Sequence, residues 1–105
     1  MKTQLRLAMV FAIAACTLPT FAQNTGAATY TSKCQMCHGA DGAGTTPAGK
    51  AMKVPSFLSP DAVKESNANL IAVTKTGKGK MPAYAGKLSD TDIKDVIAHV
   101  RTLQK

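Results

Sequence analysis

The stretch that decides the fold is Cys34-Gln35-Met36-Cys37-His38, which has the pattern C-x-x-C-H. Two thiols three residues apart at the start of a helical turn can each add to one vinyl group of a single haem. A histidine directly after the second thiol places its imidazole under the iron as the proximal ligand. The pattern therefore predicts one covalently attached haem c, with thioether links to Cys34 and Cys37 and its iron bound by His38.

Three other interpretations of the same cysteines compete with this one. A structural disulfide would close a loop of only two residues, which stabilises a fold weakly. A thioredoxin-like redox pair follows a strand of a βαβ unit, and no strand-like apolar run precedes Cys34. A structural zinc site needs two further Cys or His ligands, and beyond the motif and the first 22 residues only His99 is left. The haem interpretation is favoured over all three.

The first 22 residues differ in character from the rest of the chain. Lys2 and Arg6 precede an uncharged apolar run over residues 7–15, and Ala22 ends the segment. This pattern is typical of a secretory signal peptide, because the run is about half the roughly 20 residues that cross a bilayer. Cleavage after Ala22 would leave one domain, residues 23–105, exported to the periplasm. Export agrees with the haem prediction, since thioether attachment of haem happens outside the cytoplasm.

A rival cleavage site lies before Cys16, because Ile13-Ala14-Ala15-Cys16 resembles a bacterial lipobox. Cys16 would then become the lipidated first residue and anchor the exported domain to a membrane. The two cleavage sites stay open as alternatives.

The domain after residue 22 is basic and poor in aromatic side chains. It keeps 11 basic and 6 acidic residues, a net charge of +5, and its aromatics are Tyr30, Phe57 and Tyr84. A chain of this size buries only about 60 to 65% of its unfolded surface and usually needs a disulfide, metal or cofactor to be stable. A haem would supply much of the missing apolar interior.

The two ends of this domain carry the clearest helix signals. Gly26, Tyr30 and Cys34 fall at four-residue intervals, which places them on one face of a helix over residues 25–33. Near the C-terminus, Ser89 with Asp92 three residues later forms a capping box. The helix that follows carries an apolar stripe. The stripe consists of Ile93, Val96, Ile97, Val100 and Leu103.

Shorter helices are expected between these two. Ser59-Pro60-Asp61 predicts an N-cap and a helix running to about Glu65. Another helix is expected to start near Asn67 and to end at Gly77, with Gly77 in the left-handed αL conformation. Residues 39–49 are expected to be loop. No alternating apolar run is long enough for a strand, so the domain is predicted to be all-α.

These motifs resemble those of the small class I c-type cytochromes of the soluble bacterial and photosynthetic kind. The resemblance covers nearly all of residues 24–105. Its pieces are Gly26-x-x-x-Tyr30-x-x-x-Cys34, residues 34–39, Gly77 to Tyr84, and Leu88-Ser89-Asp90. The resemblance implies three to five short helices wrapped around one covalently bound haem, with the first and last helices crossing near Gly26. His99 is a departure, because the family often has an aromatic residue there.

Met81 is the expected distal ligand of the iron. A haem that only exchanges electrons keeps both axial positions filled, and a thioether favours Fe(II). Met36 lies within the attachment loop on the proximal side, and Met52 is placed like a gap-filling residue but remains the alternative. Met81 follows a Gly-rich turn and precedes Pro82, which fixes the local backbone.

The histidines have further expected contacts. The second ring nitrogen of His38 is expected to donate to a backbone carbonyl, with Pro47 as the candidate. By helical geometry His99 falls on the flank of the apolar stripe, so we expect it to pack against the first helix and not to bind iron.

The favoured function is a one-electron carrier and not an enzyme, with haem iron cycling between Fe(II) and Fe(III). Electrons would come from a membrane or periplasmic donor complex and pass to a terminal oxidase or reductase. The alternative is a haem peroxidase or gas sensor, which needs a polar group over the iron. The candidates for such a group, Arg101 and His99, both lie in the last helix.

The basic charge predicts acidic redox partner proteins, because lysines around a haem edge raise encounter rates with them. The lysines considered are Lys33, Lys50, Lys53, Lys75, Lys78, Lys80 and Lys87. Nucleic acid is excluded as a partner, since the chain has no binding motif and no interleaved aromatics. We expect a monomer without a membrane span.

Overall fold

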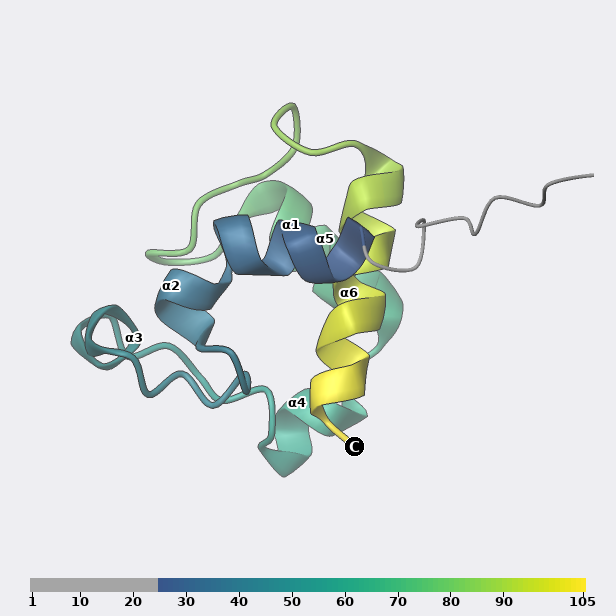
Figure 1. Ribbon diagram of the computed structural model, residues 1–105. Coiled ribbons are helices and arrows are strands. Elements are labelled where there is room, and N and C mark those ends of the chain that lie inside the picture. Colours follow the sequence, from purple (N-terminus) through teal and green to yellow (C-terminus); the bar gives the residue numbers. More distant parts are fainter. Residues whose placement is uncertain (1–24) are drawn as a thin grey trace, which may run out of the picture.

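The computed structural model describes residues 25–105, which form six helices and no strand (Figure 1). The helices are α1 (Thr25–Lys33), α2 (Gln35–His38), α3 (Pro47–Ala51), α4 (Pro60–Lys64), α5 (Asn67–Thr76) and α6 (Asp90–Leu103). The predicted signal peptide, Cys16 and both cleavage sites lie outside the described residues. None of the helices within 25–105 has the length and apolar character needed to cross a membrane.

The crossing of α1 and α6 forms the core. Tyr30 on α1 is only 1% exposed, and it packs against the buried stripe of α6. A Cβ at Gly26 would collide with the Asp95 carbonyl of α6, so only glycine allows the two backbones to approach this closely. The predicted helix, its buried face and the crossing near Gly26 are all confirmed.

The start of α6 has the predicted capping box. The Asp92 N–H donates to Ser89 Oγ (3.0 Å), and the Ser89 N–H donates to Asp92 Oδ2 (3.1 Å). These two bonds satisfy backbone donors that the helix itself leaves free. The helix then runs to Leu103, as the apolar stripe predicts.

The middle helices agree with the sequence in position and differ in two details. Helices α4 and α5 begin after the N-caps Ser59 and Ser66, whose hydroxyls each accept from the backbone N–H of the third residue of the helix. Gly77 does end α5, but its φ of 75° and ψ of 169° lie outside the αL region. The αL expectation is therefore wrong. A Cβ at Gly77 would press on the Met81 carbonyl, so the glycine allows the following loop to fold back over it.

One helix was not expected from the sequence. Helix α3 begins at Pro47, within the segment predicted to be loop. Thr46 caps it, with its hydroxyl accepting from the Gly49 N–H (2.9 Å), and proline suits the first helical position. This one-turn helix and the similarly short α2 explain why residues 25–105 contain six helices where three to five are predicted.

Candidate functional site

The candidate functional site is an almost wholly apolar cavity of about 70 Å³ that is partly open to solvent and is lined by residues of α1, α2, α5 and α6. Its lining residues come from four helices, from Cys34 between α1 and α2, and from the connections that carry Phe57 and Met81. They are Tyr30, Cys34, His38, Phe57, Leu70, Val73, Thr74, Met81, Val96, Ile97 and Val100.

The cavity brings together three of the four residues predicted to hold the haem. Cys34, His38 and Met81 all line it, although Met81 is far from the other two in sequence. Cys37, which lies between Cys34 and His38 in the sequence, is half-buried in α2 and does not line the cavity. The two other candidate methionines are outside the cavity lining, and Met36 is 79% exposed.

The Cys34–His38 segment is folded by local backbone bonds and fixed by two side chains from outside it. The His38 N–H donates to the Cys34 carbonyl (3.0 Å), which forms the single turn of α2. Tyr30 Oη donates to the Gly39 carbonyl (2.6 Å) at the end of that turn. Thr46 Oγ1 lies within hydrogen-bond distance of the carbonyls of Met36 (2.7 Å) and Cys37 (3.1 Å). The turn that carries the motif is thus held from both the α1 side and the α3 side.

Cys34 has the properties of a neutral thiol. Burial raises the pKa of the Cys34 thiol to about 11, and the nearby Cys37 adds to the rise. Reactive redox cysteines and zinc ligands need the thiolate, which a lowered pKa supplies. The environment of Cys34 therefore argues against the thioredoxin-like and zinc interpretations.

His38 is held by stacking. Its ring lies against the Phe57 ring, with centroids 4.3 Å apart and an angle of 14° between the planes. Burial lowers the pKa of His38, which favours the neutral imidazole that binds metals. Its Nδ1 is buried without a hydrogen-bond partner. The expected bond to the Pro47 carbonyl is therefore absent, and that prediction is wrong.

The loop that carries Met81 is tightly folded. Lys78 and Met81 exchange two backbone hydrogen bonds of 3.1 and 3.0 Å, which closes a four-residue turn. Further along, the N–H groups of Tyr84 and Ala85 donate to carbonyls in the last turns of α5 (3.0 and 3.1 Å). The Met81 side chain is thereby presented to the cavity from a loop with little freedom.

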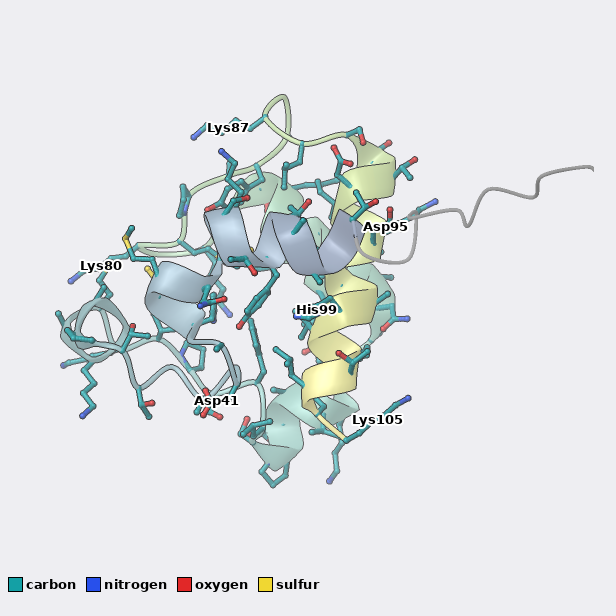
Figure 2. All side chains as sticks on the ribbon, in the orientation of Figure 1. Asp41, Lys80, Lys87, Asp95, His99 and Lys105 are labelled. Atoms are coloured by element: carbon teal, nitrogen blue, oxygen red, sulfur yellow. The ribbon has the colours of Figure 1, made fainter. Side chains whose placement is uncertain are left out.

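The polar groups that a peroxidase or gas sensor would need lie elsewhere. His99 is outside the cavity lining and packs on the Tyr30 ring, with centroids 5.0 Å apart, as predicted (Figure 2). The Arg101 guanidinium donates to Asn67 Oδ1 (2.8 Å) and to the Glu65 carbonyl, which binds the α4–α5 connection to α6. Within the cavity, the Thr74 hydroxyl already donates to the Leu70 carbonyl (2.7 Å).

These observations fit a haem. The cavity walls are apolar, and the imidazole of His38 is part of them. A thioether and a neutral thiol face the same space. Imidazole and thioether are the donor pair of electron-transferring c-type haems.

Sequence reasoning missed three residues that shape the site. Thr46 had a local signal, because Thr46-Pro47 repeats the N-cap and proline pattern of Ser59-Pro60. Phe57 and Tyr84 had no such signal, since their contacts join segments that are far apart along the chain.

Comparison with known proteins agrees with the fold and with the family that the sequence motifs resemble. A family model described as cytochrome c oxidase, cbb3-type, subunit III matches residues 21–100. Cytochrome c6 of Petalonia fascia is 38% identical over 78 residues, which are 70% of this chain and 82% of that protein. Cytochrome c6 of Picosynechococcus sp. (strain ATCC 27264 / PCC 7002 / PR-6) is 32% identical over 100 residues, covering 90% of this chain and 83% of the relative.

Solved structures lead to the same conclusion. The KustC0563 c-type cytochrome has a TM-score of 0.70 and 27% identity, over 76% of this chain and 98% of that chain. Cytochrome c6 from the diatom Phaeodactylum tricornutum has a TM-score of 0.61 and 26% identity, over 78% and 93% of the two chains. With an apolar cavity, an all-α fold and these relatives, the chain belongs to the class I c-type cytochromes, which bind haem c covalently and carry electrons without being enzymes.

Proposed function

We propose that Cys34 and Cys37 form the two thioether links to the haem, that His38 is the proximal ligand of its iron and that Met81 is the distal ligand. The observation that carries this proposal is the convergence of Cys34, His38 and Met81 on one apolar cavity. Met52 does not line the cavity, which favours Met81 over it.

Each of these residues has a defined task in electron transfer. When bound, the haem supplies the one-electron couple of Fe(II) and Fe(III). His38 is kept neutral by burial and offers a lone pair without first losing a proton. Met81 is kept in place by the turn that it forms with Lys78, so no loop movement has to accompany a change of charge at the site. The apolar walls exclude water, and low polarity around a haem is one of the means by which proteins set its potential.

Attachment can be tested by denaturing electrophoresis of holoprotein with a haem stain. Wild-type protein should keep its haem through denaturation and acid-acetone extraction. Cys34→Ala and Cys37→Ala should each leave only one link and lose much of the stain, whereas Met52→Ala should stain like wild type. Release of haem from the wild-type protein would contradict the proposal.

The proposed partners are acidic redox proteins that meet the molecule on the side of the Met81 loop. Lys78 and Lys80 come just before Met81 and are exposed, and Lys87 follows it in the same connection. Figure 2 shows Lys80 and Lys87 at two separate points on the edge of the molecule, both far from Lys105. Exposed lysines near Met81 would steer encounter with an acidic surface.

The donor is proposed to be a quinol-oxidising or dehydrogenase complex, and the acceptor a terminal oxidase or reductase. The signal-like first 22 residues support export to the periplasm.

A further inference from the structure

Tyr84 joins two parts of the site that are distant in sequence. Its hydroxyl donates to the Lys33 carbonyl over 3.0 Å, across a separation of 51 residues. Lys33 is the last residue of α1 and directly precedes Cys34. Figure 1 shows the connection between α5 and α6 passing close to the junction of α1 and α2.

The backbone bonds that join this loop to other elements all lead back to one helix, α5. The N–H groups of Tyr84 and Ala85 donate to the carbonyls of Thr74 and Lys75, both in α5. Among residues 25–105, the Tyr84 hydroxyl makes the one side-chain hydrogen bond between residues 77–88 and the segment that carries the haem motif. Without it, polar contacts would fix the Met81 loop to α5 alone.

Tyr84 is well placed to transmit this constraint to Met81. It is three residues from Met81, and its own backbone is bonded to Thr74, which lines the cavity beside Met81. Its main-chain carbonyl accepts from the N–H groups of Lys87 and Leu88 (3.0 and 2.9 Å), which fixes the far side of the loop. Tyr84 is thus fixed through its backbone within the loop, and its side-chain hydroxyl bonds to the last residue of α1.

We propose that Tyr84 is a positioning residue whose hydroxyl closes the Met81 loop against the end of α1 and so keeps Met81 on the iron. This inference rests on the proposed ligation by Met81. The loop opens when the hydroxyl bond breaks, and Met81 then leaves its position more often. An exogenous ligand captures the iron during such openings, so its limiting rate of binding reports how often the loop opens.

The test is the binding of imidazole to the oxidised holoprotein, followed by stopped-flow absorbance up to concentrations at which the rate no longer rises. Tyr84→Phe keeps the ring and removes only the hydroxyl. Loss of one hydrogen bond is expected to raise the limiting rate about 3- to 10-fold. Hydrogen exchange at the amides of Met81, Tyr84 and Ala85 should accelerate by a similar factor, because all three belong to the same opening unit.

The hydrogen bond from the Tyr84 hydroxyl to the Lys33 carbonyl is called the clamp below. Two matched variants separate the effect of losing the clamp from a general loss of structure. Thr76→Val removes a hydroxyl that donates to the Ala72 carbonyl (2.9 Å), lies 3.4 Å from the carbonyl of the adjacent Gly77, and makes no bond to α1. Lys87→Ala removes the ammonium that lies 5.9 Å from the centre of the Tyr84 ring and leaves the hydroxyl in place. Both variants should bind imidazole within about twofold of the wild-type rate, since neither breaks the bond to α1.

The outcomes distinguish the two claims. If Met81→Ala loses the sulfur-to-iron absorption band but Tyr84→Phe binds imidazole at the wild-type rate, the ligand assignment holds and the clamp is refuted. Equal acceleration in Tyr84→Phe and Thr76→Val would also refute the clamp, because it would reflect general destabilisation. If Met81→Ala keeps the band, the ligand assignment itself fails, and the clamp fails with it.

Discussion

Phe57 lies face to face with His38, with ring centroids 4.3 Å apart. Both backbone polar groups of Phe57 are hydrogen-bonded. Its N–H donates to the Gly42 carbonyl (2.8 Å), and its carbonyl accepts from Gln104 Nε2 (2.9 Å). His38 Nδ1 has no hydrogen-bond partner. In metal sites a second ring nitrogen that donates a hydrogen bond usually orients the histidine, so in this chain the orientation depends on the stacked ring.

Replacing Phe57 by alanine should therefore loosen His38 and lower stability. Phe→Ala substitutions in cores cost about 3 to 5 kcal/mol, and a half-buried ring should fall at the lower end of that range. Guanidinium unfolding of the holoprotein measures the loss. Phe57→Leu keeps most of the apolar volume and should cost less than Phe57→Ala. Unchanged stability in Phe57→Ala would show that the stacked ring does not support the site.

Gly26→Ala tests the crossing of α1 and α6. Helix propensity alone predicts that this substitution stabilises the protein by about 0.5 to 1 kcal/mol. Collision of the new Cβ with the Asp95 carbonyl should reverse the sign and destabilise it by about 1 to 3 kcal/mol. The sign of the shift in thermal midpoint decides between the two, and a rise would contradict the close approach seen in the structure.

Tyr30→Phe removes the donor to the Gly39 carbonyl. Because that hydrogen bond is buried, the carbonyl is left unsatisfied, and the expected loss of stability is about 1 to 3 kcal/mol. Denaturant titration at neutral pH measures it. A variant as stable as wild type would mean that water replaces the tyrosine at this carbonyl.

The same residue predicts a dependence on alkaline pH. Desolvation by burial, with smaller effects from Cys34 and Asp41, raises the pKa of Tyr30 to about 12 from an ordinary value of 10.0. Below pH 10 both folded and unfolded chains keep the proton, so this stabilisation is fully present. Between about pH 10 and 12 the unfolded chain loses the proton first, so stability falls as pH rises. The decline over this range should be shallower in Tyr30→Phe than in wild type, and equal slopes would exclude Tyr30 as its source.

Charge reversal tests the proposed docking side. Lys78→Glu with Lys80→Glu should slow electron transfer with an acidic partner more than Lys94→Glu with Lys105→Glu, although both pairs change net charge equally. The wild-type rate should fall as salt rises, because screening limits exposed charges to about 8 Å at physiological ionic strength. Stopped-flow kinetics at several salt concentrations measure both effects. Equal losses from the two pairs would mean that the lysines near Met81 do not direct docking.

The sequence predicts well those features whose causes are local. The periodicity of Gly26 and Tyr30, and the Ser89 capping box, specify α1 and α6 through contacts within one or two turns. Helix α3 was missed because its apolar content is low and the helix is a single turn long. The αL state expected of Gly77 was wrong because the returning Met81 loop determines the backbone angles there.

Parts of the site could not be predicted because they depend on tertiary contacts. Stacking of Phe57 on His38 requires the connection between α3 and α4 to bring Phe57 next to α2. The hydrogen bond from Tyr84 to Lys33 joins two residues that are 51 positions apart in the sequence. The C-x-x-C-H motif and the Met81-Pro82 pair identify the candidate ligands from sequence, whereas the residues that orient them emerge only from the fold.

The most direct test of the account is the near-infrared absorption of the oxidised holoprotein, where bonding between a methionine sulfur and haem iron gives a weak band. Wild-type protein and Met52→Ala should both show the band, and Met81→Ala should lose it and bind carbon monoxide when reduced. A band that survives in Met81→Ala and disappears in Met52→Ala would contradict the assignment of Met81 and the site built around it.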